Sequence, residues 1–310
     1  MSLDLLAFGD PCADVVLGTD TPPALGEKVL GRPLGVFPGG TTANVACAIS
    51  RLGRRSAVYG RVGDDTHGGL LRESLQRFGV GVEHLAVVAR TASASVIAMI
   101  AASGERAIVY MPMLPSPLDE AAFATAARRA RIVYAMPYDA AEFALISRIA
   151  HENGALVAID IEAAVAPDSA AMQQRIERAD IVFFNESGFR AGSGEAPSHA
   201  AMARLLSAGP RMVVVTRGAA GALGVDRHGF AEHPALPHQV VDTTGAGDTF
   251  NAAFLAATLE EQGLRQALRF ACAAASCTVA AIGARAGMPD RRSVDALVAR
   301  AAAELGGMPC

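Results

Sequence analysis

One short stretch of the sequence, Val240–Phe254 (VVDTTGAGDTFNAAF), places a carboxylate beside a glycine turn. It begins apolar, reaches Gly245-Ala246-Gly247 and Asp248, and continues with an apolar period that predicts a helix. Glycines let an anion approach the backbone, and a helix N-terminus supplies unpaired N–H donors at the positive end of a dipole. The stretch therefore predicts an anion cradle beside a base, which suits the transfer of a phosphoryl group to an alcohol.

Two interpretations of Asp248 remain open from this stretch alone. Aspartate often caps helices, so a bare G-x-G-D is at least as well explained by a structural role. The longer run DTTGAGDTF is far less common, and about 200 residues upstream Gly39 and Gly40 precede Asn44 at another predicted helix start. That upstream segment, taken alone, could equally be a loop and an ordinary helix with Asn44 facing solvent.

Together, the two stretches resemble the paired signatures of the ribokinase-like (PfkB) family of carbohydrate and nucleoside kinases, in the order in which that family carries them. The resemblance extends from Leu3 to Pro289. It implies transfer of the γ-phosphoryl group of ATP, with Mg²⁺, and Asp248 as the catalytic base. The residues implied at the anion hole are Gly245, Ala246 and Gly247, and those implied at the sugar are Asp14, Gly39, Gly40, Asn44 and Asp248.

A third segment, Thr216–Gly221 (TRGAAG), resembles the T-x-G-x-x-G of the same family, which runs along the nucleotide. Its alternative is a plain strand–turn–strand hairpin. In many family members the loop that corresponds to Asp242 and Thr244 binds a monovalent cation, with carbonyls near Ala281 and Gly283. Oxygen ligands suit a hard cation such as K⁺. The residues implied at the nucleotide are Asn185, Thr216, Gly218, Gly221 and Gly247.

Two positions depart from the family pattern. Family members commonly carry Asn-x-x-Glu at the end of one strand, where it organises Mg²⁺ through water, but here Asn185 is followed by Gly188 at the glutamate position. Glu186 could substitute from a different face of the segment. Cys272 stands where ribokinases carry a nucleotide-contacting asparagine, which argues against ribokinase in the narrow sense.

Composition excludes several other classes of protein. Hydrophobic residues make up 51% of the 310 residues and the net charge is −4, so a large core is expected and a nucleic-acid-binding surface is not. The sequence contains no G-x-x-x-x-G-K-[ST], G-x-G-x-x-G or paired C-x-x-C motif. Scattered cysteines and the lack of a basic leader favour a cytoplasmic protein. The longest apolar run, Phe270–Ala284, is interpreted as a buried helix rather than a membrane span.

From Pro117 to Thr216 predicted helices and strands alternate regularly, which indicates a parallel sheet covered by helices on both faces. We therefore expect a doubly wound, mainly parallel α/β fold in a single domain, 1–310. Residues 14–38 and 91–112 show instead the turn-rich pattern of β-hairpins, and we expect them to form a small β lid. A homodimer through this lid is the expected assembly.

The main hypothesis is an ATP-dependent kinase of a small sugar, that is, a ketose, a sugar acid or a pentose. A nucleoside kinase of the same fold is the first alternative; it would need aromatic residues to stack on the base, and only Phe37, Tyr110 and Tyr138 are placed for this. The second alternative is a sugar or nucleotide sensor without catalytic activity.

Overall fold

The computed structural model describes residues 2–103, 105–236 and 239–306. Within them, the body of the molecule is a nine-stranded sheet whose strands run parallel except at the edge formed by the last two along the chain. The predicted mainly parallel sheet is confirmed. In spatial order the strands are β13 (Gly229–His233), β12 (Ala222–Asp226), β11 (Met212–Thr216), β10 (Ile181–Asn185), β9 (Leu156–Ile161), β8 (Ala130–Ala135), β1 (Leu3–Phe8), β4 (Ser56–Gly63) and β5 (Gly81–Val88).

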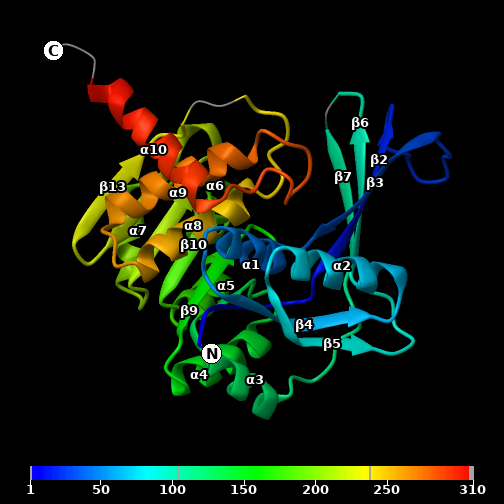
Figure 1. The fold of residues 1–310 in the computed structure, drawn as a ribbon, viewed down its shortest axis with the longest axis horizontal. Coiled ribbons are helices and arrows are strands. Elements are labelled where there is room, and N and C mark those ends of the chain that lie inside the picture. The colour runs from blue at the N-terminus through cyan, green and yellow to red at the C-terminus, as the bar shows by residue number, and fades with distance from the viewer. Residues whose placement is uncertain (1, 104, 237–238, 307–310) are drawn as a thin grey trace.

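Helices cover both faces of this sheet, as Figure 1 shows. Successive side chains of a strand point to opposite faces, so Leu5 and Leu6 of β1 join two different hydrophobic cores. The helices over the Leu5 face are α1 (Thr41–Arg51), α2 (Thr66–Arg77), α8 (Ala246–Leu259), α9 (Leu264–Thr278) and α10 (Arg291–Gly306). Those over the Leu6 face are α3 (Glu120–Ala127), α4 (Ala140–Glu152), α5 (Ser169–Ile176), α6 (Glu186–Ser193) and α7 (His199–Leu206).

A second sheet of four strands stands away from the body (Figure 1). Its spatial order is β3 (Gly31–Gly39), β2 (Cys12–Thr19), β6 (Ser95–Ala101) and β7 (Arg106–Met111). We call these four strands the lid. The two antiparallel pairs are joined by a parallel pairing of β2 with β6, so the expected small β-sheet outside the main fold is confirmed.

The apolar run Phe270–Ala284 is not one helix, and this expectation was wrong. Helix α9 ends at Thr278, and the chain then forms an irregular loop up to α10. Gly283 has a φ of 88°, and a side chain at Gly287 would collide with the carbonyl of Thr278. The apolar run continues beyond the helix into a loop that is only partly buried: Ala284 is buried, whereas Ile282 is 66% exposed.

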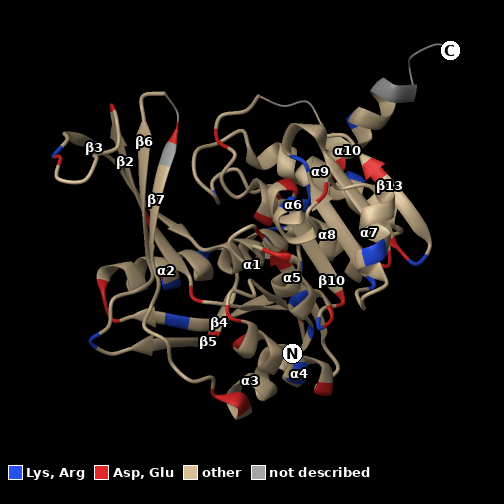
Figure 2. Cartoon of the chain, turned by 180° about the vertical axis from the view of Figure 1, so that it is seen from behind, with Lys and Arg blue, Asp and Glu red and all other residues tan. Residues whose placement is uncertain are grey.

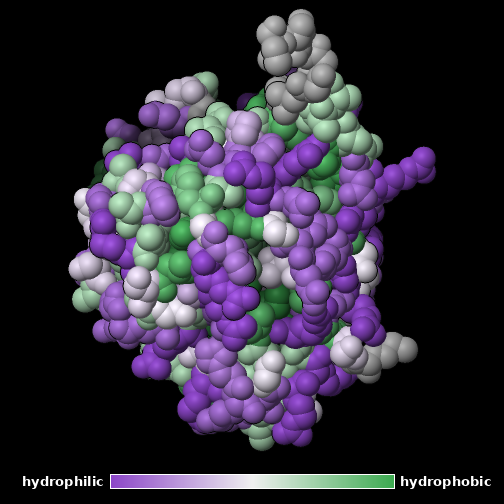
Figure 3. Space-filling model, turned by 90° about the vertical axis from the view of Figure 1, so that its left-hand side faces the viewer, coloured by the Kyte–Doolittle hydropathy of each residue, from purple (hydrophilic) through white to green (hydrophobic). Residues whose placement is uncertain are grey.

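The surface mixes charges of both signs: Figure 2 shows acidic and basic residues interspersed over both layers of helices. Figure 3 shows the side that carries β13, where hydrophilic atoms predominate and hydrophobic side chains are visible between them. Among the described residues, no helix has both the length and the apolar character that a membrane crossing requires.

Candidate active site

The two helices that meet at the site start without the polar cap that most others have. Side chains cap α2 to α7 by accepting hydrogen bonds from first-turn amides, whereas α1 starts after Gly40 and α8 after Gly245 with no side-chain cap. First-turn amides of an uncapped helix are available to a ligand. The first-turn amides of α1 and α8 are therefore left without side-chain partners at the site where these two helices start. The capping side chains elsewhere are Asp65, Asp119, Asp139, Asp168, Asn185 and Ser198.

The glycine turn before α8 is closely packed on the side of Ala284 and open on the side of Gly247. Gly245 has a φ of 77°, and a side chain there would collide with the carbonyl of Ala284. An ideal Cβ on Gly247 meets no atom within 4 Å, so the space above this residue is free. The amide of Ala246 donates to the carbonyl of Thr243 at 3.2 Å and stabilises the turn. The turn is thus shaped to leave room for an anion over Gly247.

Asp248 lies in the first turn of α8 and is paired with a residue from the other signature. Asn44 of α1 donates through Nδ2 to its Oδ2 at 2.7 Å. Burial raises the pKa of Asp248 to about 7; the Asn44 hydrogen bond and the charge of Arg285 lower it, while the charges of Glu162 and Asp14 raise it. A carboxyl with that pKa is poised to accept a proton near neutral pH.

Asp14 approaches the same place from the lid. Gly39 must be glycine because the Asp14 carboxylate fills the space where its Cβ would stand. Burial raises the pKa of Asp14 to about 6, opposed by the charge of Arg285. Gly40 has a φ of 90°, and its ideal Cβ would lie 3.0 Å from the amide nitrogen of Cys12. The structure therefore brings Asp14, Gly39, Gly40, Asn44 and Asp248 together around one space.

Strand register places two aromatic side chains on the same face of the lid as Asp14. Phe37, Asp14, Val96 and Tyr110 are aligned across the four strands of the lid, so their side chains share one face. This is the Asp14 face of the lid. Tyr110 is 54% exposed, and so its ring is available for contact.

Glycine again shapes the predicted nucleotide segment. It is a tight turn between the antiparallel strands β11 and β12, with Gly218 at a φ of 53° and open space around it. Gly221 allows close packing, because a side chain there would collide with the carbonyl of His233. Asn185 caps α6 by accepting from the amide of Gly188 at 2.7 Å. Thr216 ends β11 and donates to the carbonyl of Phe184 at 3.3 Å.

Asp242 connects the predicted cation loop to the loop after α9. Thr244 donates to its Oδ1 from the backbone at 3.0 Å and from the hydroxyl at 2.7 Å. The amide of Gly283 donates to its Oδ2 at 2.9 Å. The two segments named for K⁺ therefore lie side by side, next to the glycine turn.

The two glutamates near the missing family glutamate have different surroundings. Glu186 accepts a hydrogen bond from Arg190 at 2.9 Å, one turn along α6, and its side chain is 42% exposed. A side chain at Gly188 would collide with the carbonyl of Ile161, and its Cβ would lie 2.9 Å from Cα of Glu162. Burial raises the pKa of Glu162, and its charge raises the pKa of Asp248. The backbone at Glu162 therefore occupies the space into which a side chain at position 188 would extend.

Several residues of the site escaped the sequence analysis. Asn251 donates to Asp160 at 2.8 Å and to the Tyr134 hydroxyl at 3.0 Å, directly behind Asp248. Its position three residues after Asp248 on a helix is a signal that could have been used. Glu162 and Arg285 carried no signal, because only tertiary packing brings them to the site.

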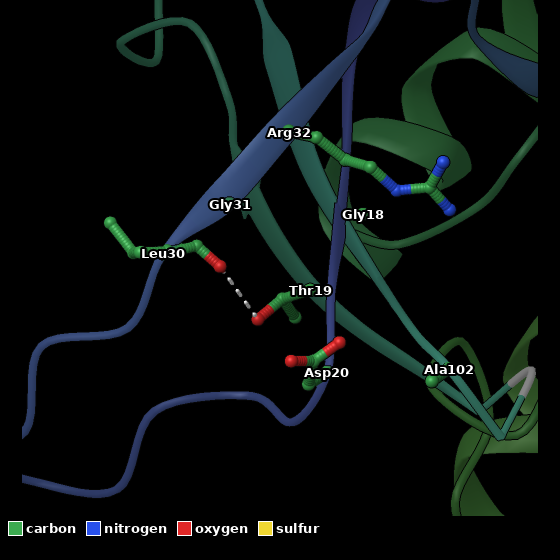
Figure 4. A pocket seen from close by; sticks show the side chains of 7 residues that line it. All are labelled: Gly18, Thr19, Asp20, Leu30, Gly31, Arg32 and Ala102. Carbon is green, nitrogen blue, oxygen red and sulfur yellow. Dashed lines mark hydrogen bonds between the residues drawn. The ribbon is translucent and has the colours of Figure 1, made fainter.

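A hollow of about 230 Å³ lies at the far end of the lid, between β2 and β3 (Figure 4). There the hydroxyl of Thr19 donates to the carbonyl of Leu30 at 3.4 Å. Thr19 ends β2 and Asp14 is near its start, so this hollow is separate from the site around Asp248.

Comparison with known proteins places the chain in a family. The sequence model of the family described as "pfkB family carbohydrate kinase" matches residues 2–291. Ribokinase of Bacillus subtilis is 30% identical over 301 residues, which cover 95% of this chain and 99% of that protein. A nucleoside kinase of Methanothermobacter thermautotrophicus is 28% identical, covering 93% of each.

Among solved structures, Arabidopsis thaliana ribokinase complexed with ribose and ATP superposes with a TM-score of 0.87 at 27% identity, covering 96% of this chain and 99% of that one. The match spans the main sheet, the lid and both signatures. The chain belongs to the pfkB family of carbohydrate kinases and is an ATP-dependent carbohydrate kinase.

Proposed function

We propose that the enzyme transfers the γ-phosphoryl group of ATP to a hydroxyl of a small free sugar, namely a ketose, a sugar acid or a pentose. The observation that carries this proposal is the pair of a buried Asn44 amide and a half-buried Asp248 carboxylate, which faces Asp14 across a space bounded by glycine backbone. These polar groups offer hydrogen bonds to several hydroxyls of one small ligand. A buried polar group that loses its hydroxyl partner costs more than a missing apolar contact, so such a site selects polyols.

In this proposal Asp248 accepts the proton of the attacking hydroxyl, while Asn44 and Asp14 orient the acceptor. The free amides at the start of α8, around Gly247, hold the charge of the transferred group. Thr216, Gly218, Gly221 and Asn185 lie along the nucleotide. Positioning and electrostatic stabilisation supply most of the rate in this chemistry.

Mg²⁺, when bound with ATP, neutralises phosphate charge. The described residues contain no group of three or more His, Cys, Asp or Glu side chains able to hold a metal. The nucleotide and water would therefore supply most of its ligands, with a protein carboxylate acting through water, which is usual for this ion. We propose Glu162 for this role because it lies at the place of the missing family glutamate; Glu186, which pairs with Arg190, is the second candidate.

A nucleoside kinase is the alternative that a specific observation favours. Phe37 and Tyr110 share the lid face with Asp14, one on each side of it, and could hold a base by stacking. Stacking of a base on an aromatic ring contributes about 1–3 kcal/mol, measured by substitution with alanine. Phe37→Ala and Tyr110→Ala would then weaken the binding of a nucleoside much more than the binding of a free sugar.

A substrate panel tests the proposal. We expect kcat/KM for fructose, 2-keto-3-deoxygluconate or ribose to exceed that for adenosine and inosine, and Asp14→Ala to lower kcat/KM most for the best sugar. If a nucleoside led by about tenfold or more, a difference of about 1.4 kcal/mol, the alternative would replace the free-sugar proposal.

We further propose that the enzyme is a homodimer through the lid. Val36, Val15, Ile97 and Val109 are aligned across the four strands on the face opposite Asp14. Val36 is 43% exposed and Val109 49%. A sheet face with an aliphatic row exposed to water is stabilised by association with a second apolar surface. The same face of a second copy supplies one in a symmetric dimer.

A further inference from the structure

Arg285, in the loop between α9 and α10, is a buried cation bonded only to neutral oxygen atoms. Its side chain is 6% exposed. Its guanidinium donates to Asn44 Oδ1 at 2.8 Å, to Ser74 Oγ at 2.9 Å and to the carbonyl of Gly39 at 2.9 Å. No ion pair between Arg285 and a carboxylate is found in the described part of the chain. Burying a charge in this way is costly, so the arrangement needs a physical reason.

The contact with Asn44 fixes the orientation of its amide. A guanidinium has donors and no acceptor, so the oxygen of the Asn44 amide must face Arg285. The Nδ2 group then faces Asp248, to which it donates at 2.7 Å. Without Arg285, the amide could turn over and present its oxygen to Asp248, an arrangement that favours the protonated carboxyl, because only that form has an O–H to donate.

The other contacts of Arg285 and its loop fix the surroundings of this pair. Ser74 belongs to α2, and Gly39 is the residue against which the Asp14 carboxylate packs. The preceding residue, Ala284, packs under Gly245 at the start of α8. One loop therefore contacts the amide that is bonded to the base, the backbone of the acceptor-binding segment and the anion turn.

We propose that Arg285 is a positioning residue of the phosphotransfer site: by occupying the acceptor of Asn44 it makes that amide a donor only, and so holds Asp248 as an ionised base directed at the acceptor hydroxyl. This inference rests on the proposed role of Asp248. Arg285 itself does not touch the reacting atoms; it acts through Asn44.

The proposal has a signature in pH dependence. The groups around Asp248 are Asn44 on α1, Asp14 on the lid, Glu162 after β9 and Arg285. Asp160, Tyr134 and Tyr138 also lie near it, and its charge raises the pKa of each of these three. The charges of Asp14 and Glu162 raise the pKa of Asp248, whereas the charge of Arg285 lowers it. Removing the guanidinium therefore shifts the ionisation of Asp248 to higher pH, and activity on the acidic side falls most.

The experiment compares Arg285→Met and Arg285→Lys with Arg175→Met. Arg175 is a matched control: it is 5% exposed and bonds only to the carbonyls of Pro137, Tyr138 and Ala171. For Arg285→Met we expect kcat/KM for the acceptor at pH 6 to fall about 10- to 100-fold, the scale of a lost charged hydrogen bond. The Kd of ATP should stay within about twofold, and Arg285→Lys should recover part of the loss.

A second readout does not depend on turnover. The carboxyl ¹³C resonance of Asp248, assigned by its absence in Asp248→Asn, is titrated in each folded variant. We expect its midpoint to move to higher pH in Arg285→Met and to stay in place in Arg175→Met. An unmoved midpoint in folded Arg285→Met overturns the proposal. If that variant does not fold, Arg285→Gln takes its place, because it also removes the charge but keeps amide donors, and an unmoved midpoint there has the same meaning.

The two readouts separate this inference from the proposed function. If Asp248→Asn retained near-normal turnover, the role of Asp248 as base would be lost, whatever the titration showed. If Asp248→Asn is inactive and the titration midpoint does not move without Arg285, the base assignment stands and the positioning role is wrong.

Discussion

The floor of the site, formed by Asp248, Asn44 and Arg285, and the lid above it differ in how their functional groups are held. On the floor, Asn44 and Arg285 are buried, Asp248 is half-buried, and each is hydrogen-bonded within the protein. On the lid, one face carries Asp14 between two aromatic rings, and the other carries the exposed aliphatic row that includes Val109. The chemistry thus depends on groups that are already placed, whereas the lid has faces whose partners come from outside, as proposed above. Each prediction below tests one side of this contrast.

The largest effect is expected on the floor. Asp248→Asn should lower kcat by about 10²- to 10⁴-fold, the usual scale of lost general-base assistance, and leave ATP binding nearly intact. Single-turnover rates and ATP titrations measure the two quantities. Asp226→Asn is the control, since this buried aspartate caps the β12–β13 turn by accepting from His228 and Gly229. Near-normal turnover of Asp248→Asn would contradict the base assignment.

The next effect is expected on the outer face of the lid. Val109→Lys should weaken dimerisation by about tenfold or more, because a charge placed in an apolar interface costs more than about 1.4 kcal/mol. Ile108→Lys is the matched control: it is the neighbouring exposed residue, 63% exposed, but it points to the Asp14 face. Sedimentation velocity over a concentration series distinguishes them. Equal dissociation of both variants, or a monomeric wild type, would contradict the proposed dimer through the lid.

A smaller effect concerns Mg²⁺. Glu162→Gln should raise the Mg²⁺ concentration for half-maximal rate by about tenfold, the low end of the usual range for removing an outer-shell partner of a metal. The Mg²⁺ dependence of ATP binding, measured by calorimetry, should change in parallel. Glu186→Gln is the comparison, and a larger change there would assign the role to Glu186. No change in either variant would mean that other groups organise the metal.

The smallest effect is expected from K⁺. Replacing Tris or choline with K⁺ at matched ionic strength should raise the rate a few-fold, because a cation beside Asp242 would fix the loop that carries the glycine turn. Asp242→Asn should reduce this response. Equal initial rates in both salts would exclude the cation from the site.

The sequence predicted the body of the fold well and the connections within the site poorly. Alternating elements and two glycine signatures are local patterns, so the parallel sheet and the positions of Asp14, Asn44 and Asp248 could be read from them. Asn44 and Arg285 are separated by 241 residues and meet only through packing. The end of α9 at Thr278 was missed for a different reason, since the apolar composition of the helix continues unchanged into a partly exposed loop.

The long separation between the two halves of the floor has a consequence for synthesis. The lid strands and Asn44 emerge from the ribosome first, whereas Asp248 and Arg285 emerge only with the last part of the chain. Because domains fold as units, and α1 shares one hydrophobic core with α8 and α9, the acceptor-binding side and the base take shape together once the last part of the chain is available. A chain truncated before the loop that carries Arg285 is therefore expected to lack the folded site altogether, rather than to keep the acceptor-binding half of it.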